Sequence, residues 1–318
     1  MGIVCGPIRW IEPEPSIDVA RGCLRFHTER GHGWADSGVK RIDVMMHNDH
    51  VRAVGPYVLA RPLEPSPHGE RWLACHSQTQ TDWILHEFGP LLDKCERVMV
   101  LSWLETMETI EHAHLPKIRR VIDPGSSRIW AAEPFLGSED GLLTFGRLVD
   151  LKGGRMPPHE VERAMLHILD AVRYAHARGL CHGPIGPRDL LVDRHGSITI
   201  DLYGLRRRVE GLVACDAELV RDEVRSVAML GYWALTGLEA EEPRIRAGRL
   251  VRRLDRVWDD WFELALDPAS GFSSAEEAIA ALPSSKRAVE PETRPSGART
   301  VIERLRTAWS IGSAAVGE

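Results

Sequence analysis

The sequence predicts an α+β protein in which a strand-rich part comes first and a helical part follows. Residues 53–137 contain short runs rich in valine, leucine and tryptophan with turns between them, plus one helical stretch near Val98 to Ile110. After Gly137 the apolar residues recur mainly at helical spacing. Because the two kinds of pattern are segregated along the chain, we expect a β-rich lobe over 53–137 and a larger helical lobe over 138–284.

The composition is that of a globular protein. The chain has 318 residues, of which 43% are hydrophobic, and its formal net charge is −6. This charge argues against a general nucleic-acid binder, because phosphate binding is driven by clustered positive charge. No run approaches the roughly 18 consecutive apolar residues of a membrane span, and the N-terminus lacks a charged-then-apolar signal pattern. We therefore expect a cytoplasmic protein without a membrane span.

Two segments at the ends are expected to lie outside the two lobes. Residues 1–52 are polar and weakly periodic, so they are interpreted as an extension whose order is left open. Residues 285–318 begin with a linker rich in proline, serine and charge. A short amphipathic helix follows it, opened by a capping-box pattern at Thr300 and Glu303. This tail helix has three candidate contacts: its own domain, a partner or a membrane.

The cysteines indicate the compartment expected for the protein, and the basic residues indicate the kind of organism. The six cysteines are scattered, without the paired spacing of a zinc site or a disulfide framework, so free thiols in a reducing compartment are expected. Only five of the 40 basic residues are lysines, a bias that favours a bacterial protein from a GC-rich genome.

The segment CHGPIGPRDLLVDRHGSITIDLYGL, residues 181–205, predicts an ordered loop followed by a hairpin. Two prolines and two glycines exclude a helix at its start. Two short strands then flank the turn at residues 193–196. Upstream, a helix is expected from Pro158 to Gly179, with apolar residues at helical spacing: Val161, Met165, Ile168, Leu169, Val172 and Ala175.

This order of strands, helix, loop and hairpin resembles the protein kinases, in particular the bacterial serine/threonine kinase-like domains. The similarity covers about 57–283 and implies a two-lobed kinase-like fold. It is carried by these segments: YVLARPLEPSPHGERWLA (57–74), DWILHEF (82–88), IEHAHL (110–115), WAAEPF (130–135), VRYAHARGLCHGPIGPRDLLVDRHGSITIDLYGL (172–205), VRSVAMLGYWALTG (224–237) and LALDPASGFSSAEEAIAAL (264–282).

The resemblance also implies that the nucleotide-binding positions are changed. Of the three glycines of the family's phosphate loop only Gly69 is kept. The lysine of the third strand becomes His86, a poor substitute for a permanent ammonium. Its partner glutamate corresponds to Trp103, with Glu105 close by. The adenine pocket is narrowed, because Ile84 replaces a small alanine and Arg71 replaces a valine in its roof.

The positions of the family's catalytic loop are changed too. His182 remains, but Pro184 stands in place of the catalytic aspartate and Gly186 in place of the loop lysine. The metal-binding asparagine becomes Asp189, the one weak candidate for holding a cation. The Asp-Phe-Gly motif becomes Leu202, Tyr203 and Gly204. Asp201 lies one residue early and is expected to point to the opposite side of an extended chain.

These changes predict a pseudokinase, a kinase-like protein that is not an enzyme, with weak or absent binding of ATP and magnesium, no cofactor and no metal. Pocket remnants remain at Gly69, Arg71, Ile84, Ala132, Glu133, Tyr203 and Gly204. The expected role is that of a signalling scaffold or allosteric regulator that binds a partner protein such as a kinase. Two alternatives stay open. The chain could be an enzyme of altered nucleotide or metal chemistry that uses Asp189, Asp201 or Glu133, or it could be a small-molecule sensor.

Overall fold

The computed structural model describes residues 52–89, 93–123, 128–138 and 141–283. All of them belong to one compact unit of the chain, His47–Glu318. The expected tail helix, and the expected extension apart from Arg52, lie outside the described residues. Within the described residues no helix is long and apolar enough to cross a membrane.

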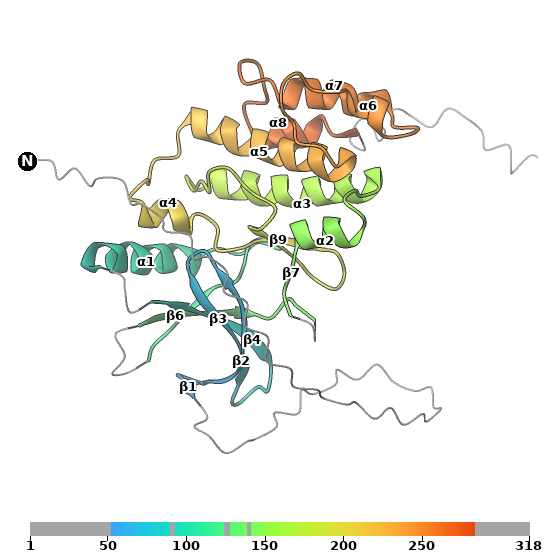
Figure 1. The fold of residues 1–318 in the computed structure, drawn as a ribbon. Coiled ribbons are helices and arrows are strands. Elements are labelled where there is room, and N and C mark those ends of the chain that lie inside the picture. Colours follow the sequence, from blue (N-terminus) through green and yellow to red (C-terminus); the bar gives the residue numbers. More distant parts are fainter. Residues whose placement is uncertain (1–51, 90–92, 124–127, 139–140, 284–318) are drawn as a thin grey trace, which may run out of the picture. The chain divides into compact units, whose positions relative to one another are not determined.

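The first part of this unit is an antiparallel sheet of six strands, ordered β1-β2-β3-β4-β6-β5 (Figure 1). The strands are β1 (Ala53–Val54), β2 (Tyr57–Ser66), β3 (Gly69–His76), β4 (Asp82–Phe88), β5 (Arg119–Val121) and β6 (Ile129–Pro134). Between β4 and β5 the chain forms helix α1 (Lys94–Met107). A capping box of Asp93 and Glu96 starts this helix, because the two residues satisfy backbone N–H groups that have no partner within the helix.

The second part is mainly helical. Its elements are β7 (Leu143–Thr144), α2 (Phe145–Leu151), α3 (Pro158–His176), β8 (Leu190–Val192), β9 (Ile198–Ile200), α4 (Leu205–Val209), α5 (Ala217–Thr236), α6 (Ala247–Leu250), α7 (Arg256–Ala265) and α8 (Ala275–Ala280). Helices α3 and α5 lie side by side in its centre (Figure 1). All six apolar residues expected on one face of α3 are buried. The fold class and the order of elements predicted from the sequence are confirmed.

The hairpin of β8 and β9 shows why a local pattern predicts a local structure well. Asp193 Oδ1 accepts hydrogen bonds from the backbone N–H groups of His195 and Ser197, each at 2.8 Å. Gly196 takes the left-handed conformation, with φ 76°, which closes the turn. The strands then pair from Leu190 opposite Ile200. Every one of these contacts joins residues no more than ten positions apart in sequence.

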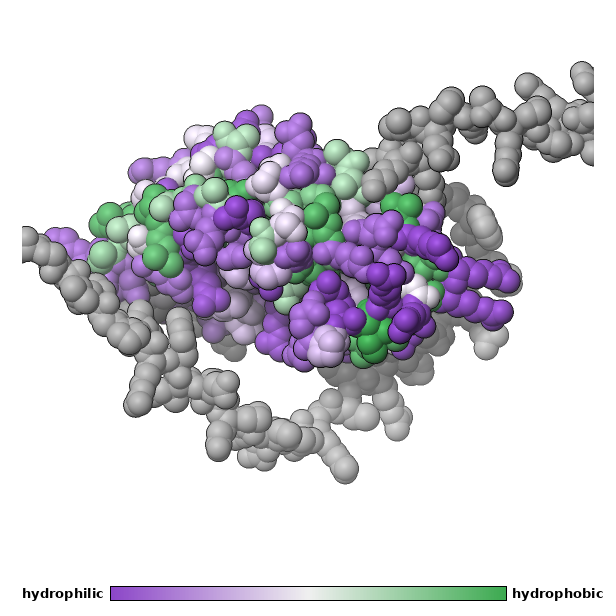
Figure 2. All heavy atoms as spheres, turned by 90° about the horizontal axis from the view of Figure 1, so that it is seen from above, coloured by the Kyte–Doolittle hydropathy of each residue, from purple (hydrophilic) through white to green (hydrophobic). Residues whose placement is uncertain are grey.

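The main hydrophobic core joins the two parts. It includes α1 residues such as Trp103 and Leu104 together with α3, α5 and the segment after β9. A smaller cluster packs on the opposite face of the sheet around Leu85, Trp130 and Ala132. On the outside, hydrophilic side chains dominate the face seen from the side of α6 and α7, with smaller hydrophobic areas between them (Figure 2).

The cysteines correct one expectation. Cys181 and Cys215 form a disulfide, whereas Cys75 and Cys95 are free; Cys5 and Cys23 lie outside the described residues. The prediction of free thiols throughout is therefore wrong. The paired cysteines are 34 positions apart, and they meet because the chain runs through β8, β9 and α4 and then returns to the end of α3.

Candidate functional site

Four ionisable side chains come together on the inner face of the sheet, the face that meets the helical part. They are Arg71 on β3, His86 on β4, Glu133 on β6 and Asp201 just after β9, and we call them the polar quartet. Their exposed fractions are 5%, 1%, 1% and 8%. Such burial is exceptional for charged groups, which are rarely taken out of water unless they are paired.

Strand register explains how the sheet supplies three of these residues. Arg71 lies directly opposite His86 on the neighbouring strand, and Glu133 lies opposite Ile84. Side chains two apart on a strand share a face, so Ile84 and His86 point to the same side. The same alternation places Ala132 on the other face, in the cluster with Leu85 and Trp130. The Ala132 side chain, predicted as a remnant of the pocket, therefore does not face the quartet.

Two contacts hold the quartet together. The Arg71 guanidinium donates to the Asp201 carboxylate, and the two side chains form an ion pair. His86 Nε2 lies 2.9 Å from Glu133 Oε1. Three further buried polar atoms of the quartet, Nε of Arg71, Nδ1 of His86 and Oδ1 of Asp201, have no hydrogen-bond partner within the described part of the chain. The quartet thus keeps hydrogen-bonding capacity that the described residues do not use.

Asp201 pairs with Arg71, a contact that the sequence did not predict. Ile198, Ile200 and Leu202 pack in the main core, whereas Asp201, between Ile200 and Leu202, faces the sheet. The residues after β9 form a turn, in which Leu202 has a left-handed φ of 42°. The Asp201 N–H donates to the Asp189 carbonyl oxygen at 2.7 Å. The side opposite Leu202, to which Asp201 was expected to point, is thus the side that carries the quartet.

The electrostatic environment of Asp201 is strongly perturbed. Burial raises the pKa of Asp201 above its usual range, and the nearby charge of Glu133 acts in the same direction. The Arg71 guanidinium opposes this rise of the pKa, because it favours the ionised carboxylate. Perturbed carboxyl groups of this kind cluster at functional sites, although structural ion pairs can perturb a pKa as well.

The turn between β2 and β3 corresponds to the predicted phosphate loop and carries a basic environment. His68 lies at its tip, and burial lowers the pKa of His68 to about 4; the neighbouring basic side chains of His182, Arg71, Arg206 and His86 lower it as well. Gly69 has φ 148°, and a Cβ at this position would lie 2.2 Å from the Glu87 carbonyl oxygen. The turn can therefore lie this close to β4 only with glycine at position 69.

The backbone of the 181–189 loop is held by Glu223, a residue that was not predicted from the sequence. Glu223 on α5 is fully buried, and its Oε2 accepts hydrogen bonds from the N–H groups of His182 and Gly183 at 2.8 and 3.0 Å. Its Oε1 accepts from the Tyr203 hydroxyl. An acidic residue next to the apolar run that starts at Val224 was the signal that could have identified it.

The remaining predicted positions lie around the quartet and the loop. Pro184 is exposed, whereas Asp189 is partly buried and accepts a hydrogen bond from the Gly186 N–H at 2.7 Å. Trp103, in the position of the family's helix glutamate, is buried, and its Nε1 donates to the Tyr203 carbonyl oxygen at 2.8 Å. Helix α1 is thus linked to the segment after β9 by a neutral hydrogen bond rather than to β4 by an ion pair.

Part of the chain is similar in sequence to known proteins. No protein-family model matches the chain. It is 29% identical over 102 residues to CBL-interacting protein kinase 9 of Oryza sativa subsp. japonica, which covers 32% of this chain and 21% of that protein. It is 28% identical over 161 residues to CBL-interacting serine/threonine-protein kinase 3 of Arabidopsis thaliana, which covers 48% of this chain and 34% of that protein. The chain thus spans about a third or less of the length of these relatives.

Solved structures show the same likeness in three dimensions. The kinase domain of PknI from Mycobacterium tuberculosis has a TM-score of 0.57 and 20% sequence identity, and the match covers 74% of this chain and 98% of that domain. A double mutant of the same domain has a TM-score of 0.58 at 19% identity, covering 76% of this chain and 99% of that domain.

These comparisons contradict the prediction that the chain is not an enzyme, because the relatives and structural neighbours are named as protein kinases or kinase domains. The prediction counted changes at the family's usual positions. With its curled antiparallel sheet followed by a helical lobe, the chain has the protein kinase-like fold.

Proposed function

We propose that this chain is a signalling enzyme of kinase-like fold, in which the polar quartet binds the nucleotide and a metal ion in place of the family's usual residues. The observation that carries this proposal is the burial of four ionisable groups in one place. Removing a charge from water costs several kcal/mol, and apolar residues of similar volume are often at least as stable as a buried ion pair. A site selected only for stability has little reason to keep the quartet.

Arg71 supports the phosphate-binding part of the proposal. A guanidinium is always charged and presents a planar set of N–H donors that matches the oxygens of a phosphate. A second guanidinium, that of Arg206, is close enough to act together with Arg71 on His68 at the loop tip. A triphosphate would compete with the Asp201 carboxylate for the Arg71 donors.

Asp201 and its neighbours support the metal-binding part. One ligand atom each of His86, Glu133 and Asp201 lie within 4.8 Å of one another. Asp189 is near enough for its charge to act on Asp201. Carboxylates alone suit Mg²⁺, whereas a set that includes imidazole suits Mn²⁺ and other transition metals. When bound, such an ion would neutralise phosphate charge during group transfer.

The proposal includes a setting and a second role. We place the protein in the bacterial cytoplasm, acting in signalling on or through a partner protein that is a kinase or another signalling protein. The arginine-rich composition and the likeness to a bacterial kinase domain support this setting. A scaffolding contact is favoured by Leu212 and Val213, which are 49% and 57% exposed in the segment between α4 and α5.

The test compares nucleotide binding and transfer in wild type, Arg71→Met and a matched control, Arg120→Met, an exposed arginine on β5 of the same sheet. With ATP and Mg²⁺ or Mn²⁺ we expect the wild-type melting temperature to rise by several degrees, since a ligand that binds only the folded state stabilises it. The rise should vanish in Arg71→Met and persist in Arg120→Met. Incubation with γ-labelled ATP should label the chain or an acceptor protein. A wild-type chain that shows neither a rise nor labelling with either metal would refute the proposal.

The scaffolding role has its own test. A pull-down of binding proteins by the full chain should lose a specific partner when Leu212 and Val213 are both changed to aspartate, and truncation before residue 285 should show whether the tail contributes. If the double variant and the truncated chain retain every partner of the wild type, neither surface carries a scaffold contact.

A further inference from the structure

A second group of metal-ligand side chains lies away from the polar quartet. His176 ends α3, Cys181 begins the 181–189 loop and Cys215 precedes α5. One imidazole nitrogen and the two sulfur atoms all lie within 4.8 Å of one another. The two sulfur atoms are joined as a disulfide, with their Cα atoms 5.5 Å apart. Imidazole and thiolate are the ligands that Zn²⁺ prefers in proteins.

The Nε2 atom of His176 is buried and makes no hydrogen bond within the described part of the chain. It lies 3.5 Å from Glu223 Oε2, within ion-pair distance, but that oxygen already accepts the N–H groups of His182 and Gly183. Buried polar atoms normally form hydrogen bonds, so an imidazole nitrogen without one beside two sulfur atoms calls for an explanation.

We propose that the reduced protein binds a zinc ion between His176 Nε2 and the thiolates of Cys181 and Cys215, and that the disulfide is the oxidised, metal-free form of the same site. Three protein ligands leave a fourth tetrahedral position, which a water molecule or the Glu223 carboxylate fills. The site does not depend on the proposed nucleotide chemistry, because it shares no residue with the polar quartet.

The change between the two forms balances by thiol–disulfide exchange with a dithiol reductant. A thiolate of the reductant attacks one sulfur atom of the disulfide and forms a mixed disulfide, which the second thiol of the reductant then resolves. Two electrons and two protons pass to the cysteines, and the reductant leaves as its own disulfide. Zinc binding to both thiolates releases two protons, so the affinity rises with pH.

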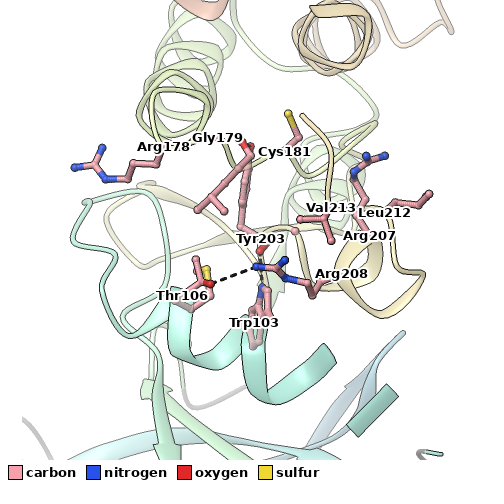
Figure 3. Close-up of a pocket in the computed structure, with 13 residues that line it drawn as sticks. Trp103, Thr106, Arg178, Gly179, Cys181, Tyr203, Arg207, Arg208, Leu212 and Val213 are labelled. Atoms are coloured by element: carbon pink, nitrogen blue, oxygen red, sulfur yellow. Dashed lines mark hydrogen bonds between the residues drawn. The ribbon is translucent and has the colours of Figure 1, made fainter. Parts of the chain in front are cut away.

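One of the three residues, Cys181, also lines a pocket, whereas His176 and Cys215 are not among the residues that line it. Cys181 lines a pocket of about 260 Å³ together with Tyr203, Arg207, Arg208 and Leu212 (Figure 3). Arg207 donates from its guanidinium to the Ala214 carbonyl at 2.9 Å, which holds the chain next to Cys215. The site would therefore tie the segment between α4 and α5 to the 181–189 loop in both the oxidised and the zinc-bound form.

The test measures metal content in the full chain. Protein reduced with a phosphine, equilibrated with zinc without oxygen and dialysed should hold about one zinc ion per chain more than the oxidised protein. His176→Ala and Cys215→Ser should each lose this ion or bind it at least tenfold more weakly. The matched control is Cys95→Ser, which removes an exposed free thiol and should retain the ion. The melting temperature of each variant checks that it folds.

Cobalt provides a second readout that does not depend on affinity. Co²⁺ in the reduced protein should give an intense tetrahedral d–d spectrum with a thiolate charge-transfer band, and the band should weaken in Cys215→Ser but not in Cys95→Ser. If the reduced wild type binds no zinc, or if His176→Ala leaves zinc binding unchanged, the cysteines form only a disulfide and the proposal is wrong.

Discussion

Replacing Arg71 with methionine should destabilise the protein by about 3–5 kcal/mol at pH 8, the usual cost of removing one partner from a buried ion pair. Arg71 and Asp201 are 5% and 8% exposed, so water cannot replace the lost contact. Methionine keeps most of the side-chain volume, which limits the contribution of a cavity. For a unit of this size the loss corresponds to a fall in melting temperature of roughly 10 °C.

The pH dependence of this loss has a definite sign. Burial already raises the pKa of Asp201, and Arg71 is the main influence that lowers it. Without Arg71 the pKa of Asp201 rises further, so the folded variant holds a proton that the unfolded chain releases above its ordinary carboxyl pKa. The contribution of Asp201 to stability is then present at low pH and is lost as the pH rises through the folded-state pKa. Arg71→Met should therefore be less destabilised at pH 5.5 than at pH 8.

Urea unfolding followed by tryptophan fluorescence measures both effects. The double variant Arg71→Met with Asp201→Leu removes both charges and should lie within about 1 kcal/mol of wild type, or above it. The control Arg120→Met, at an exposed position, should stay within about 0.5 kcal/mol. If the double variant is as unstable as Arg71→Met alone, the loss does not come from an uncompensated Asp201 carboxylate and the reasoning fails.

Three further predictions concern the loop tip and the disulfide. Gly69→Ala should lower the free energy of unfolding, measured with urea, by about 2 kcal/mol or more, because the new Cβ would lie 2.2 Å from a carbonyl oxygen of β4. Gly153→Ala, at a position with φ 82° and open space around it, should lower it by less. The pKa of His68 is about 4 in the folded protein, against an ordinary value of 6.5 for a histidine exposed in the unfolded chain, so stability is lost as the pH falls from 6.5 to 4. His68→Gln should therefore flatten the dependence of melting temperature on pH over this range. Reduction of the Cys181–Cys215 disulfide in the presence of a chelator should lower the free energy of unfolding by about 4 kcal/mol. The loss comes from the loop-closure entropy of the 34 positions that separate the two cysteines. A free energy of unfolding that reduction leaves unchanged would contradict this.

Much of the fold could be predicted because its signals are local. The helical spacing after Pro158 identified the buried face of α3, and the turn at Asp193 identified the β8–β9 hairpin. These elements depend on residues that are near one another in sequence, so neighbouring side chains and backbone preferences are enough to specify them. The ordered segments along the chain then indicated the kinase-like fold before any contact between the lobes was known.

The candidate site could be predicted only in part. Arg71, His86 and Glu133 were identified at positions of the nucleotide pocket, and they do lie together on one face of the sheet. Their pairing partners were not identified, because the ion pair to Asp201 joins residues 130 positions apart. Glu223 was missed for the same reason, since its hydrogen bonds reach the 181–189 loop from a different helix.

By itself the sequence determined the type and order of the elements, because these follow from periodicity and turn chemistry along the chain. Only the tertiary structure decided which ionisable groups meet. The packing of the sheet against the segment after β9 brings Asp201 to Arg71, and the return of the chain to the end of α3 joins Cys215 to Cys181. Contacts of this kind depend on the packing of distant segments, and no short-range pattern in the chain encodes them.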